Sequence, residues 1–371
     1  MIYLDHGATS FPKPQCVRMA MERAMRCCAN PGRGGYEAAM AAARTVFFCR
    51  EQAAQLFDCQ PEQVVFTANC THGLNIAIRS LVKPGDRVVI SGFEHNAVTR
   101  PLHALDAQVA VAGRCLFDPA DTLEAFDREL SQGADVAVFT HVSNVFGYIL
   151  PVEKIAQLCR SYGVPFILDA AQSAGTLQVQ LKALGADFIA MPGHKGLLGP
   201  MGTGILLCGK LPQPLMAGGT GSESQSQAMP DFLPDRAEPG TLNVPGIAGL
   251  GAGIAHLRRM DLKTIAKREH DAAVCCAQGL RELGFQAFTG ENQGGTVSFI
   301  PKMDCEDAAQ LLANAGIGVR AGLHCAPLAH ESAGTLETGT VRLSFGVDAS
   351  PSQCAAFLQA AQKSLFVKSK M

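Results

Sequence analysis

Up to about residue 210, the chain alternates short apolar runs with longer amphipathic segments. The runs are rich in Val, Ile and Phe, which is typical of strands buried on both faces. Between them, apolar residues recur at three- and four-residue spacing, as in helices that cover a sheet. The pattern predicts an α/β fold with a mainly parallel sheet between layers of helices. The predicted strands are 2–4, 64–67, 87–90, 109–111, 136–139, 165–169, 187–191 and 205–207.

A polar, glycine-rich loop at 218–243 changes the pattern. After it, a helix is predicted from about Ile247 to Arg259, continuing as a helical stretch to Leu283. Strands and helices mix in the remainder, which is an α+β pattern. We therefore predict an N-terminal segment 1–16 packing near the active site, a large domain 17–254 and a small α+β domain 255–371. Further predicted elements are helices 17–28 and 37–57, a helix that opens within 68–75 and runs through Ser80, helices 152–162, 305–315 and 351–364, and strands 296–300 and 340–344.

Polar residues follow directly after several predicted strands. His95, Asn144, Asp169, Gln172 and Lys195 each lie just past a strand end. In a parallel α/β sheet, the carboxyl ends of the strands form the edge that binds ligands. This shared placement predicts that the five residues surround one site.

Lys195 lies at the tip of the turn Gly193-His194-Lys195, between two apolar runs. A lysine that is desolvated or placed near another cation can form Schiff bases. An ordinary exposed loop lysine would explain the same residue. The turn alone does not decide between the two.

Asp169 ends a very apolar strand, where a carboxylate is costly unless a cation or strong donor pairs with it. Thr71 opens a helix after strand 64–67, the layout that binds anions through backbone N–H groups. Pyridoxal phosphate needs such an acid and such a cradle, together with a lysine and a flat group such as His95. Singly, Asp169 or Thr71 could be a helix N-cap, and His95 a turn histidine bonded to backbone. Together with Lys195 they predict a pyridoxal 5'-phosphate site.

The C-terminal part contributes a candidate nucleophile. Cys325 follows a glycine-bearing turn close to Arg320 and His324, surroundings that favour the thiolate. The other cysteines, out of 14, are interpreted mostly as small buried hydrophobic residues. Arg342, in the next strand, could grip a substrate carboxylate through two parallel hydrogen bonds. A surface ion pair is the alternative for Arg342.

Composition and charge exclude several classes of protein. A net charge of −2 gives no reason to expect nucleic acid or a membrane surface as partner. Neither a signal peptide nor a transmembrane run is apparent, so a cytoplasmic protein is expected. A cysteine-rich metal-binding or redox protein is disfavoured, because the sequence contains no C-x-x-C pair. The vicinal pairs Cys27-Cys28 and Cys275-Cys276 do not easily give the tetrahedral geometry of a zinc site, so we expect no bound metal. A nucleotide-binding dehydrogenase is disfavoured by the missing G-x-G-x-x-G.

Taken together, eight segments resemble the class V aminotransferase family of fold-type I pyridoxal-phosphate enzymes, specifically its cysteine desulfurase/selenocysteine lyase branch. The resemblance covers essentially the whole chain. The Arg-x-Gly-x-His-Cys segment is more similar to the Suf-type (group II) desulfurases than to the Isc-type ones. The segments are Tyr3-Leu4-Asp5, Thr71-His72-Gly73-Leu74-Asn75, Glu94-His95-Asn96, Thr140-His141-Val142-Ser143-Asn144, Asp169-Ala170-Ala171-Gln172, Gly193-His194-Lys195, Gly240-Thr241-Leu242-Asn243 and Arg320-Ala321-Gly322-Leu323-His324-Cys325-Ala326.

The resemblance implies a role for each matching residue. Lys195 would hold the cofactor as a Schiff base and move the substrate proton, and Cys325 would take sulfur from L-cysteine as a persulfide, leaving L-alanine. His95 would stack on the ring and count among the catalytic residues. Among the other cofactor contacts, Asp169 would pair with the ring nitrogen and Gln172 with the ring oxygen. Thr71 and His194 would bind the phosphate, and Thr241 would reach the phosphate of the other subunit across a homodimer interface. Cys70 and Asn144 complete the predicted cofactor contacts. The substrate contacts would come from Ala8, Asn144, Arg320 and Arg342.

Three positions depart from the family's pattern. Pro192 stands where a hydroxyl residue often donates to the phosphate, Asn96 replaces a second histidine, and Leu323 precedes His324. The substrate therefore stays open between L-cysteine, L-selenocysteine and another cysteine derivative. We predict a cysteine desulfurase, with selenocysteine lyase, another β-elimination or an aminotransferase activity as the alternative. A sulfur-acceptor protein is a candidate partner.

Overall fold

The computed structural model describes residues 1–32 and 34–365, so the end of the predicted domain 255–371 lies outside the described residues. The strands are β1 (Ile2–Tyr3), β2 (Val64–Thr67), β3 (Arg87–Ser91), β4 (Gln108–Ala112), β5 (Val136–Thr140), β6 (Phe166–Asp169), β7 (Phe188–Pro192), β8 (Gly204–Cys208), β9 (Gln286–Phe288), β10 (Thr296–Ile300), β11 (Ile317–Gly318), β12 (Arg320–Gly322) and β13 (Thr340–Ser344). The helices are α1 (Gln15–Cys27), α2 (Glu37–Phe57), α3 (Cys70–Leu81), α4 (Asn96–Ala104), α5 (Pro119–Ser131), α6 (Val152–Tyr162), α7 (Leu181–Leu184), α8 (Val244–Leu257), α9 (Leu262–Glu282), α10 (Cys305–Asn314), α11 (Pro327–Ala333) and α12 (Pro351–Ser364), with 3₁₀ turns at Pro61–Gln63 and Asp235–Ala237.

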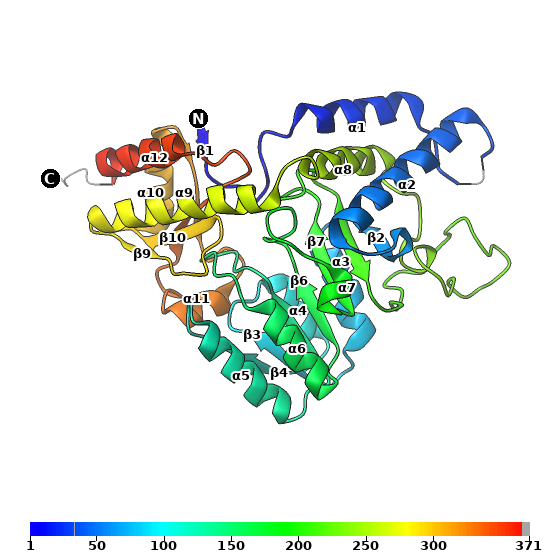
Figure 1. Ribbon diagram of the computed structural model, residues 1–371, viewed down its shortest axis with the longest axis horizontal. Helices are drawn as coiled ribbons and strands as arrows, with labels where there is room; N and C mark the ends of the chain where they lie inside the picture. Colours follow the sequence, from blue (N-terminus) through cyan, green and yellow to red (C-terminus); the bar gives the residue numbers. More distant parts are fainter. Residues whose placement is uncertain (33, 366–371) are drawn as a thin grey trace.

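A seven-stranded sheet in the order β2-β8-β7-β6-β5-β3-β4 forms the centre of the larger part (Figure 1). Only β8 runs antiparallel to its neighbours among the strands of this sheet. Successive strand residues face opposite sides, so Val88 and Ile90 pack with α3 and α4, whereas Val89 packs with the core under α2, α5, α6 and α8. The predicted α/β architecture with a mainly parallel sheet between helices is confirmed.

A second, antiparallel sheet in the order β12-β13-β10-β9 belongs to the C-terminal part. Its apolar face packs with α9, α10 and α12 in a separate hydrophobic cluster. β1 pairs in parallel with β11, and Leu4 lies in this second cluster, so the two ends of the chain fold together. α9 contributes Ile265 to the large core and Ala273 to the second cluster. The boundaries at 16/17 and 254/255 stay a prediction.

One predicted helical stretch is interrupted in the structure. The helical stretch expected to continue from Ile247 to Leu283 breaks between α8 and α9. The Asp261 carboxylate accepts hydrogen bonds from the N–H groups of Lys263 and Thr264 and so caps the start of α9. Asp followed by a helical pattern is the signal that would have located this break.

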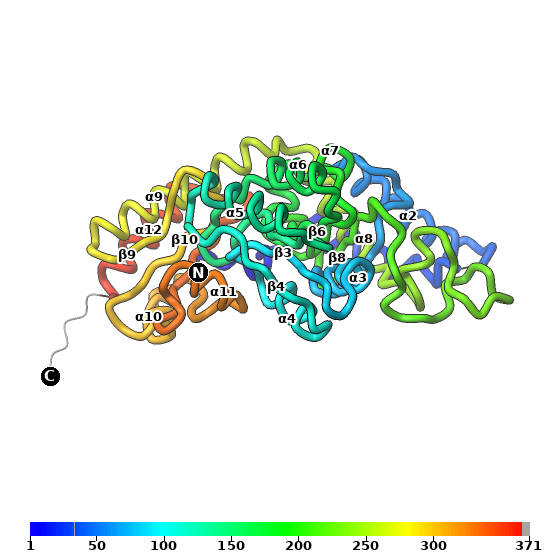
Figure 2. The backbone as a smooth tube through the Cα atoms, turned by 90° about the horizontal axis from the view of Figure 1, so that it is seen from below, coloured from blue at the N-terminus to red at the C-terminus, as the bar shows by residue number. Residues whose placement is uncertain are grey.

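The two views show how the ends of the molecule differ. α9, α10 and α12 gather at one end, and α1, α2 and the loop before α8 lie at the other (Figures 1 and 2). None of the helices formed by residues 1–32 and 34–365 combines the length and apolarity that a membrane crossing requires.

Candidate active site

A cavity of about 120 Å³ lies at the carboxyl ends of β5, β6 and β7 and at the N-termini of α3 and α4. We call it the strand-end cavity. The polar residues predicted to share one site therefore do meet. The residues of the prediction that line it are Cys70, Thr71, His95, Asn144, Asp169, Gln172, His194 and Lys195.

Thr241 lies elsewhere. It is exposed and lines a different cavity with His72 and Thr203. Its predicted contact reaches the phosphate of another subunit, which a single chain does not test. That role stays a prediction.

Asp169 is the buried acid of the strand-end cavity. It is the last residue of β6, and only 3% of its surface is exposed. Its Oδ1 accepts from Ala171 N over 2.8 Å and from Cys70 Sγ over 3.5 Å, and a turn rather than a helix follows it. Burial raises the pKa of Asp169, and the N–H of Ala171 and the charge of Lys195 oppose this. No ion pair reaches Asp169 from the described residues, so a ligand cation would complete its surroundings.

Lys195 follows β7, the strand that pairs with β6, and lines the same cavity. No hydrogen bond or ion pair to its Nζ comes from the part of the chain that the structure describes. Burial, and then the charge of Arg342, lower the pKa of Lys195. A lysine with a lowered pKa supplies the neutral amine that condenses with an aldehyde. The interpretation as an ordinary exposed loop lysine does not fit this environment.

His95 combines the two interpretations made for it. It caps α4, where its Nδ1 accepts from Ala97 N over 3.0 Å, and it also lines the strand-end cavity. Burial, followed by the charges of Lys195 and Arg342, lowers the pKa of His95 to about 4. The ring is therefore neutral near pH 7, with its proton on Nε2 because Nδ1 is an acceptor. A neutral, fixed ring suits stacking on a planar cofactor.

Thr71 and His194, which also line the strand-end cavity, suit the binding of an anion. Thr71 lies in the first turn of α3, where N–H groups have no intrahelical partner. Burial lowers the pKa of His194 to about 4, and its Nδ1 is buried without a hydrogen-bond partner among the described residues. A neutral His194 could therefore donate to a phosphate oxygen. Pro192 lines the cavity without an N–H, as its sequence position implied.

The N-terminal segment holds the lysine turn through one carbonyl group. The His194 oxygen accepts from Ser10 N (3.0 Å), Thr9 Oγ1 (3.0 Å), Ser10 Oγ (3.2 Å) and Lys13 Nζ (2.7 Å). Because His194 precedes Lys195, these bonds fix the backbone that carries the amine. Sequence reasoning missed Lys13, and its lone position after Pro12 offered no signal.

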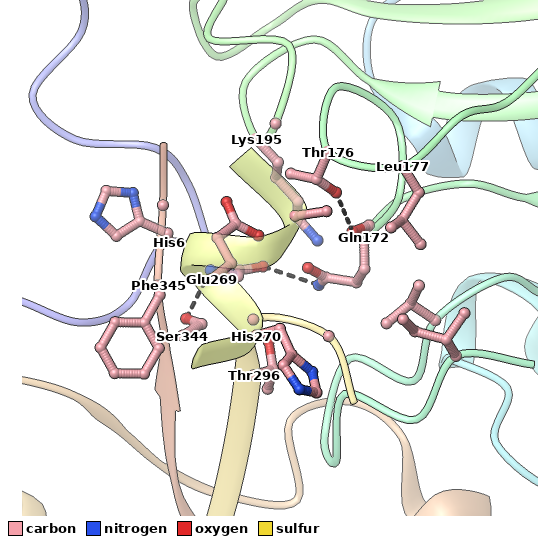
Figure 3. Close-up of a pocket in the computed structure, with 18 of the residues that line it drawn as sticks. His6, Gln172, Thr176, Leu177, Lys195, Glu269, His270, Thr296, Ser344 and Phe345 are labelled. Atoms are coloured by element: carbon pink, nitrogen blue, oxygen red, sulfur yellow. Dashed lines mark hydrogen bonds between the residues drawn. The ribbon is translucent and has the colours of Figure 1, made fainter. Parts of the chain in front are cut away.

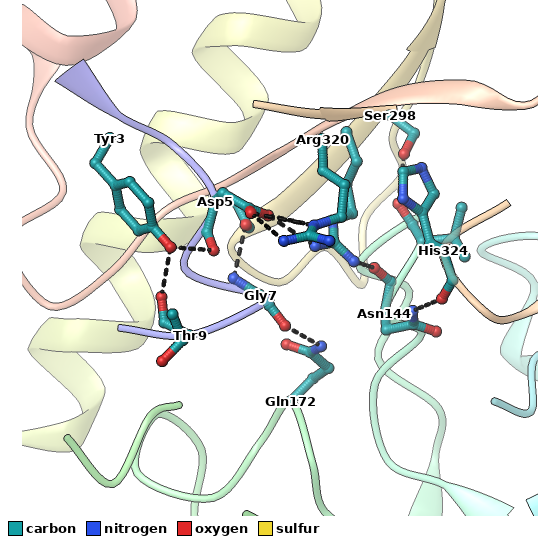
Figure 4. A network of polar contacts seen from close by, with 12 residues as sticks. Tyr3, Asp5, Gly7, Thr9, Asn144, Gln172, Ser298, Arg320 and His324 are labelled. Atoms are coloured by element: carbon teal, nitrogen blue, oxygen red, sulfur yellow. Dashed lines mark hydrogen bonds and ion pairs between the residues drawn. The ribbon is translucent and has the colours of Figure 1, made fainter. Parts of the chain in front are cut away.

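A buried ion pair connects the N-terminal segment to the C-terminal sheet (Figure 4). Arg342 Nη2 donates to Asp5 Oδ1 over 2.9 Å, and Nη1 donates to the Asn144 carbonyl over 3.0 Å. Arg320 Nη2 donates to Asp5 Oδ2 over 2.8 Å. The alternative of a surface ion pair for Arg342 is wrong, because its side chain is only 3% exposed. Arg342 Nε is buried and has no hydrogen-bond partner among the described residues, so it can still donate a hydrogen bond to an oxygen atom of a ligand.

The loop that carries Cys325 is tied to the rim of the strand-end cavity. Asn144 Nδ2 donates to the His324 carbonyl over 2.9 Å, and Asn96 N donates to the Cys325 carbonyl over 2.8 Å. His324 and Cys325 both have positive φ angles, 51° and 56°, a conformation that non-glycine residues seldom adopt. Cys325 itself is exposed. Its side chain is thus presented outside the protein core at the site's edge.

A larger cavity, of about 330 Å³, adjoins the first and shares Val142, Ala171, Gln172 and Lys195 with it (Figure 3). Helix α9 contributes Glu269 to its wall. Ala8, a predicted substrate contact, lines neither cavity, although its neighbours Gly7 and Ser10 line the larger one. Arg320 and Arg342 also line neither cavity, and both donate to Asp5.

Comparison with known proteins agrees with this geometry. The family model described as "Aminotransferase class-V" matches residues 2–357. A probable cysteine desulfurase of Methanothermobacter thermautotrophicus is 35% identical over 92% of this chain and 89% of the relative. One of Pyrococcus abyssi is 32% identical over 96% of this chain and 92% of the relative.

Among solved structures, the apo form of a cysteine desulfurase from Thermococcus onnurineus NA1 superposes with a TM-score of 0.90 at 31% identity. The match covers 98% of this chain and 94% of that one. Sequence, fold and site geometry thus agree, and the chain belongs to the class V aminotransferase family.

Proposed function

We propose that this protein is a pyridoxal-phosphate-dependent cysteine desulfurase, which converts L-cysteine to L-alanine and takes the sulfur as a persulfide on Cys325. One observation carries the proposal: Lys195 and Asp169 line the same cavity, and within residues 1–32 and 34–365 Lys195 Nζ has no hydrogen-bond or ion-pair partner and the buried Asp169 has no ion pair. The names of the relatives at 35% and 32% identity, and of the solved structure at 31%, support the same activity.

The residues present fit pyridoxal phosphate. Asp169 would pair with the ring nitrogen, Gln172 with the ring oxygen and His95 with the ring face, while Lys195 would hold the aldehyde carbon. Phosphate contacts would come from Thr71, His194 and the N-terminus of α3, and the free Nδ1 of His194 offsets the donor that Pro192 lacks. When bound, the cofactor supplies an electron sink for negative charge at the substrate Cα.

The protein's own groups would position and move the atoms of the substrate. Arg342 would bind the substrate carboxylate through its free Nε. Lys195, as a neutral amine, would take the Cα proton and return a proton to carbon. The Cys325 thiolate would attack the substrate sulfur, so that an S–S bond forms as the substrate Cβ–S bond breaks. The electron pair of that bond stays on carbon, which a proton then completes to alanine.

A homodimer is part of the proposal. Exposed large hydrophobic side chains concentrate on α1, α2 and the turn between them, which lie at the end of the molecule away from α12. Burial of such a patch against a second copy would be favourable. It would also allow Thr241 to reach the other subunit's phosphate. The exposed residues are Met19, Met25, Tyr36, Met40, Phe47 and Phe48. A cytoplasmic location, a Suf-type mechanism and an acceptor protein for the sulfur belong to the same proposal.

The test measures alanine released from L-cysteine by the wild type and by Cys325→Ala. We expect the variant to lose at least about a hundredfold in turnover, about 2.7 kcal/mol of transition-state stabilisation. Cys115→Ala, at another exposed cysteine, is the matched control and should retain wild-type turnover. Unchanged L-cysteine turnover in Cys325→Ala would rule out the persulfide step. If the variant keeps activity on L-selenocysteine alone, the desulfurase assignment holds and lyase activity accompanies it.

A further inference from the structure

Three thiols meet where the second half of α9 packs against α12, in the C-terminal part of the chain. Cys275 and Cys276 come from α9 and Cys354 from α12. The Sγ atoms of Cys354 and Cys275 are 2.8 Å apart, and Cys276 also lies within hydrogen-bonding reach of Cys354. None of the three lines the strand-end cavity or the larger cavity beside it. The proposed desulfurase reaction therefore leaves this cluster unexplained.

The three thiols differ in exposure. Cys275 is exposed, whereas Cys276 and Cys354 are buried. A small reagent can therefore reach one sulfur of the cluster from solvent, and a second sulfur lies directly behind it. Among the described residues, no group of His, Cys, Asp and Glu is arranged to hold a metal ion. The arrangement is that of an accessible thiol backed by a resolving thiol.

We propose that Cys275 and Cys354 form an oxidation site, in which a low-molecular-weight disulfide converts the two thiols into a disulfide that joins α9 to α12. A disulfide needs its sulfur atoms about 2.0 Å apart. Small side-chain rotations would close the 2.8 Å separation without moving either helix far.

The chemistry of the cluster supports this exchange. Hydrogen bonds from Cys276, and more weakly from Cys275, lower the pKa of Cys354 to about 7 against the opposing effect of burial. The same contact with Cys354, together with burial, raises the pKa of Cys275 to about 11, so the thiol that loses its proton near neutral pH is Cys354. Because the Cys354 sulfur faces the Cys275 thiol, it can accept the proton of Cys275 as the latter reacts.

The exchange occurs in two balanced steps. Cys275 sulfur attacks the small disulfide R–S–S–R, its proton passes to Cys354, and one R–S⁻ leaves. Cys354 then loses its proton to solvent, attacks the Cys275 sulfur and displaces the second R–S⁻. In sum, two protein thiols are oxidised, and one R–S–S–R is reduced to two R–SH. The new bond would join residues 79 positions apart in sequence. Because it would close such a long loop, it would strongly reduce the conformational entropy of the unfolded chain.

The experiment treats the full-length holoenzyme with glutathione disulfide and then blocks free thiols with an alkylating reagent. Peptide mapping should identify a linked pair of peptides containing Cys275 and Cys354, and dithiothreitol should release it. The oxidised wild type should unfold a few degrees above the reduced form, because the bond removes freedom from the unfolded chain. Cys275→Ser should show neither the linked peptides nor the shift.

Two further variants complete the test. Cys276→Ser should still form the Cys275–Cys354 link, and Cys27→Ser, at an exposed cysteine of α1, serves as the unrelated control. A wild type that carries glutathione on Cys275 with Cys354 left free would overturn the proposal. A link between Cys276 and Cys354 in place of Cys275 would overturn it as well. Because Cys275 is exposed, Cys275→Ser should fold normally. It therefore tests the proposal even if Cys354→Ser, which replaces a buried residue, fails to fold.

Discussion

Arg342 Nη2 lies 2.9 Å from Asp5 Oδ1, and the two side chains are only 3% and 11% exposed. Asp5 follows β1, the first strand of the chain, and Arg342 is the middle residue of β13, the last strand among the described residues. The same guanidinium donates to the Asn144 carbonyl, and the Asn144 side chain holds the loop of Cys325. One buried ion pair therefore connects the N-terminal segment, strand β13 and the loop that carries Cys325.

Removing the negative charge of this pair should destabilise the fold. Asp5→Asn leaves Arg342 buried without a compensating charge, which destabilises proteins by about 3–5 kcal/mol. Urea unfolding measures the loss. The control is Glu37→Gln, which breaks the exposed pair with Arg44 and should change the unfolding free energy by less than about 1 kcal/mol. Equal losses in both variants would show that burial of the Asp5 pair is energetically unimportant.

Arg342→Lys should weaken binding of L-cysteine. A lysine cannot reach Asp5, the Asn144 carbonyl and a substrate carboxylate at once, because it lacks the planar guanidinium. We expect KM to rise at least about tenfold, with a smaller change in kcat. Arg320→Lys is the matched control, because Arg320 also pairs with Asp5 but its side chain is half exposed, whereas that of Arg342 is buried. A comparable rise in KM for Arg320→Lys would place the carboxylate site at Arg320 instead.

Most of the large sheet could be predicted from the sequence, because strands buried on both faces read as continuous apolar runs. Strand 64–67 of this sheet matches the observed bounds, as do strands 296–300 and 340–344 of the C-terminal sheet. Several elements were missed. Among them are β9, which has only three residues, α4, whose helical pattern is interrupted by Pro101, and the longer helix α5. The parallel pairing of β1 with β11 depends on contacts between distant parts of the chain, which no local pattern records.

The cavity residues were predictable for a different reason. Asp169 and Lys195 follow strands of one sheet, so sheet topology brings them together without further information. The partners of these residues were not predictable in the same way. Asp5 reaches Arg342 across 337 positions, and Lys13 reaches the His194 carbonyl across 181. Such pairs depend on how the N-terminal segment docks, which periodicity does not encode.

Gly196→Ala should disturb the lysine turn. A Cβ at Gly196 would lie 2.3 Å from the Ala174 carbonyl oxygen, a backbone atom that cannot move aside as a side chain can. We expect a loss of about 1–3 kcal/mol in unfolding free energy and less pyridoxal phosphate retained after dialysis. Gly219→Ala is the control, because a Cβ there would meet no atom within 4 Å. If both variants retain the cofactor equally, the close approach to Ala174 does not position Lys195.

Glu269→Gln should change how stability depends on pH. Burial, and then the charge of Asp348, raise the pKa of Glu269 to about 8, against about 4.3 for an exposed glutamate. Between these values the folded protein holds a proton that the unfolded chain has released. The wild-type unfolding free energy should therefore receive a contribution that falls as pH rises, by about 1.4 kcal/mol per pH unit.

Glutamine does not ionise, so the variant should lose this contribution to the slope. Urea unfolding at about pH 5.5 and about pH 8 compares the two proteins. Glu291→Gln, at an exposed carboxylate of the same cavity, is the matched control. A wild-type slope that survives in Glu269→Gln would assign the pH dependence to another group.

The most direct test of the site is the reduction of purified holoenzyme with borohydride. We predict a visible absorption band that disappears on reduction, and a phosphopyridoxyl group found by peptide mapping on Lys195. Lys195→Ala should show neither. A protein that stays colourless after incubation with pyridoxal phosphate, or a label found on Lys13 instead of Lys195, would contradict the assignment of the strand-end cavity as the cofactor site.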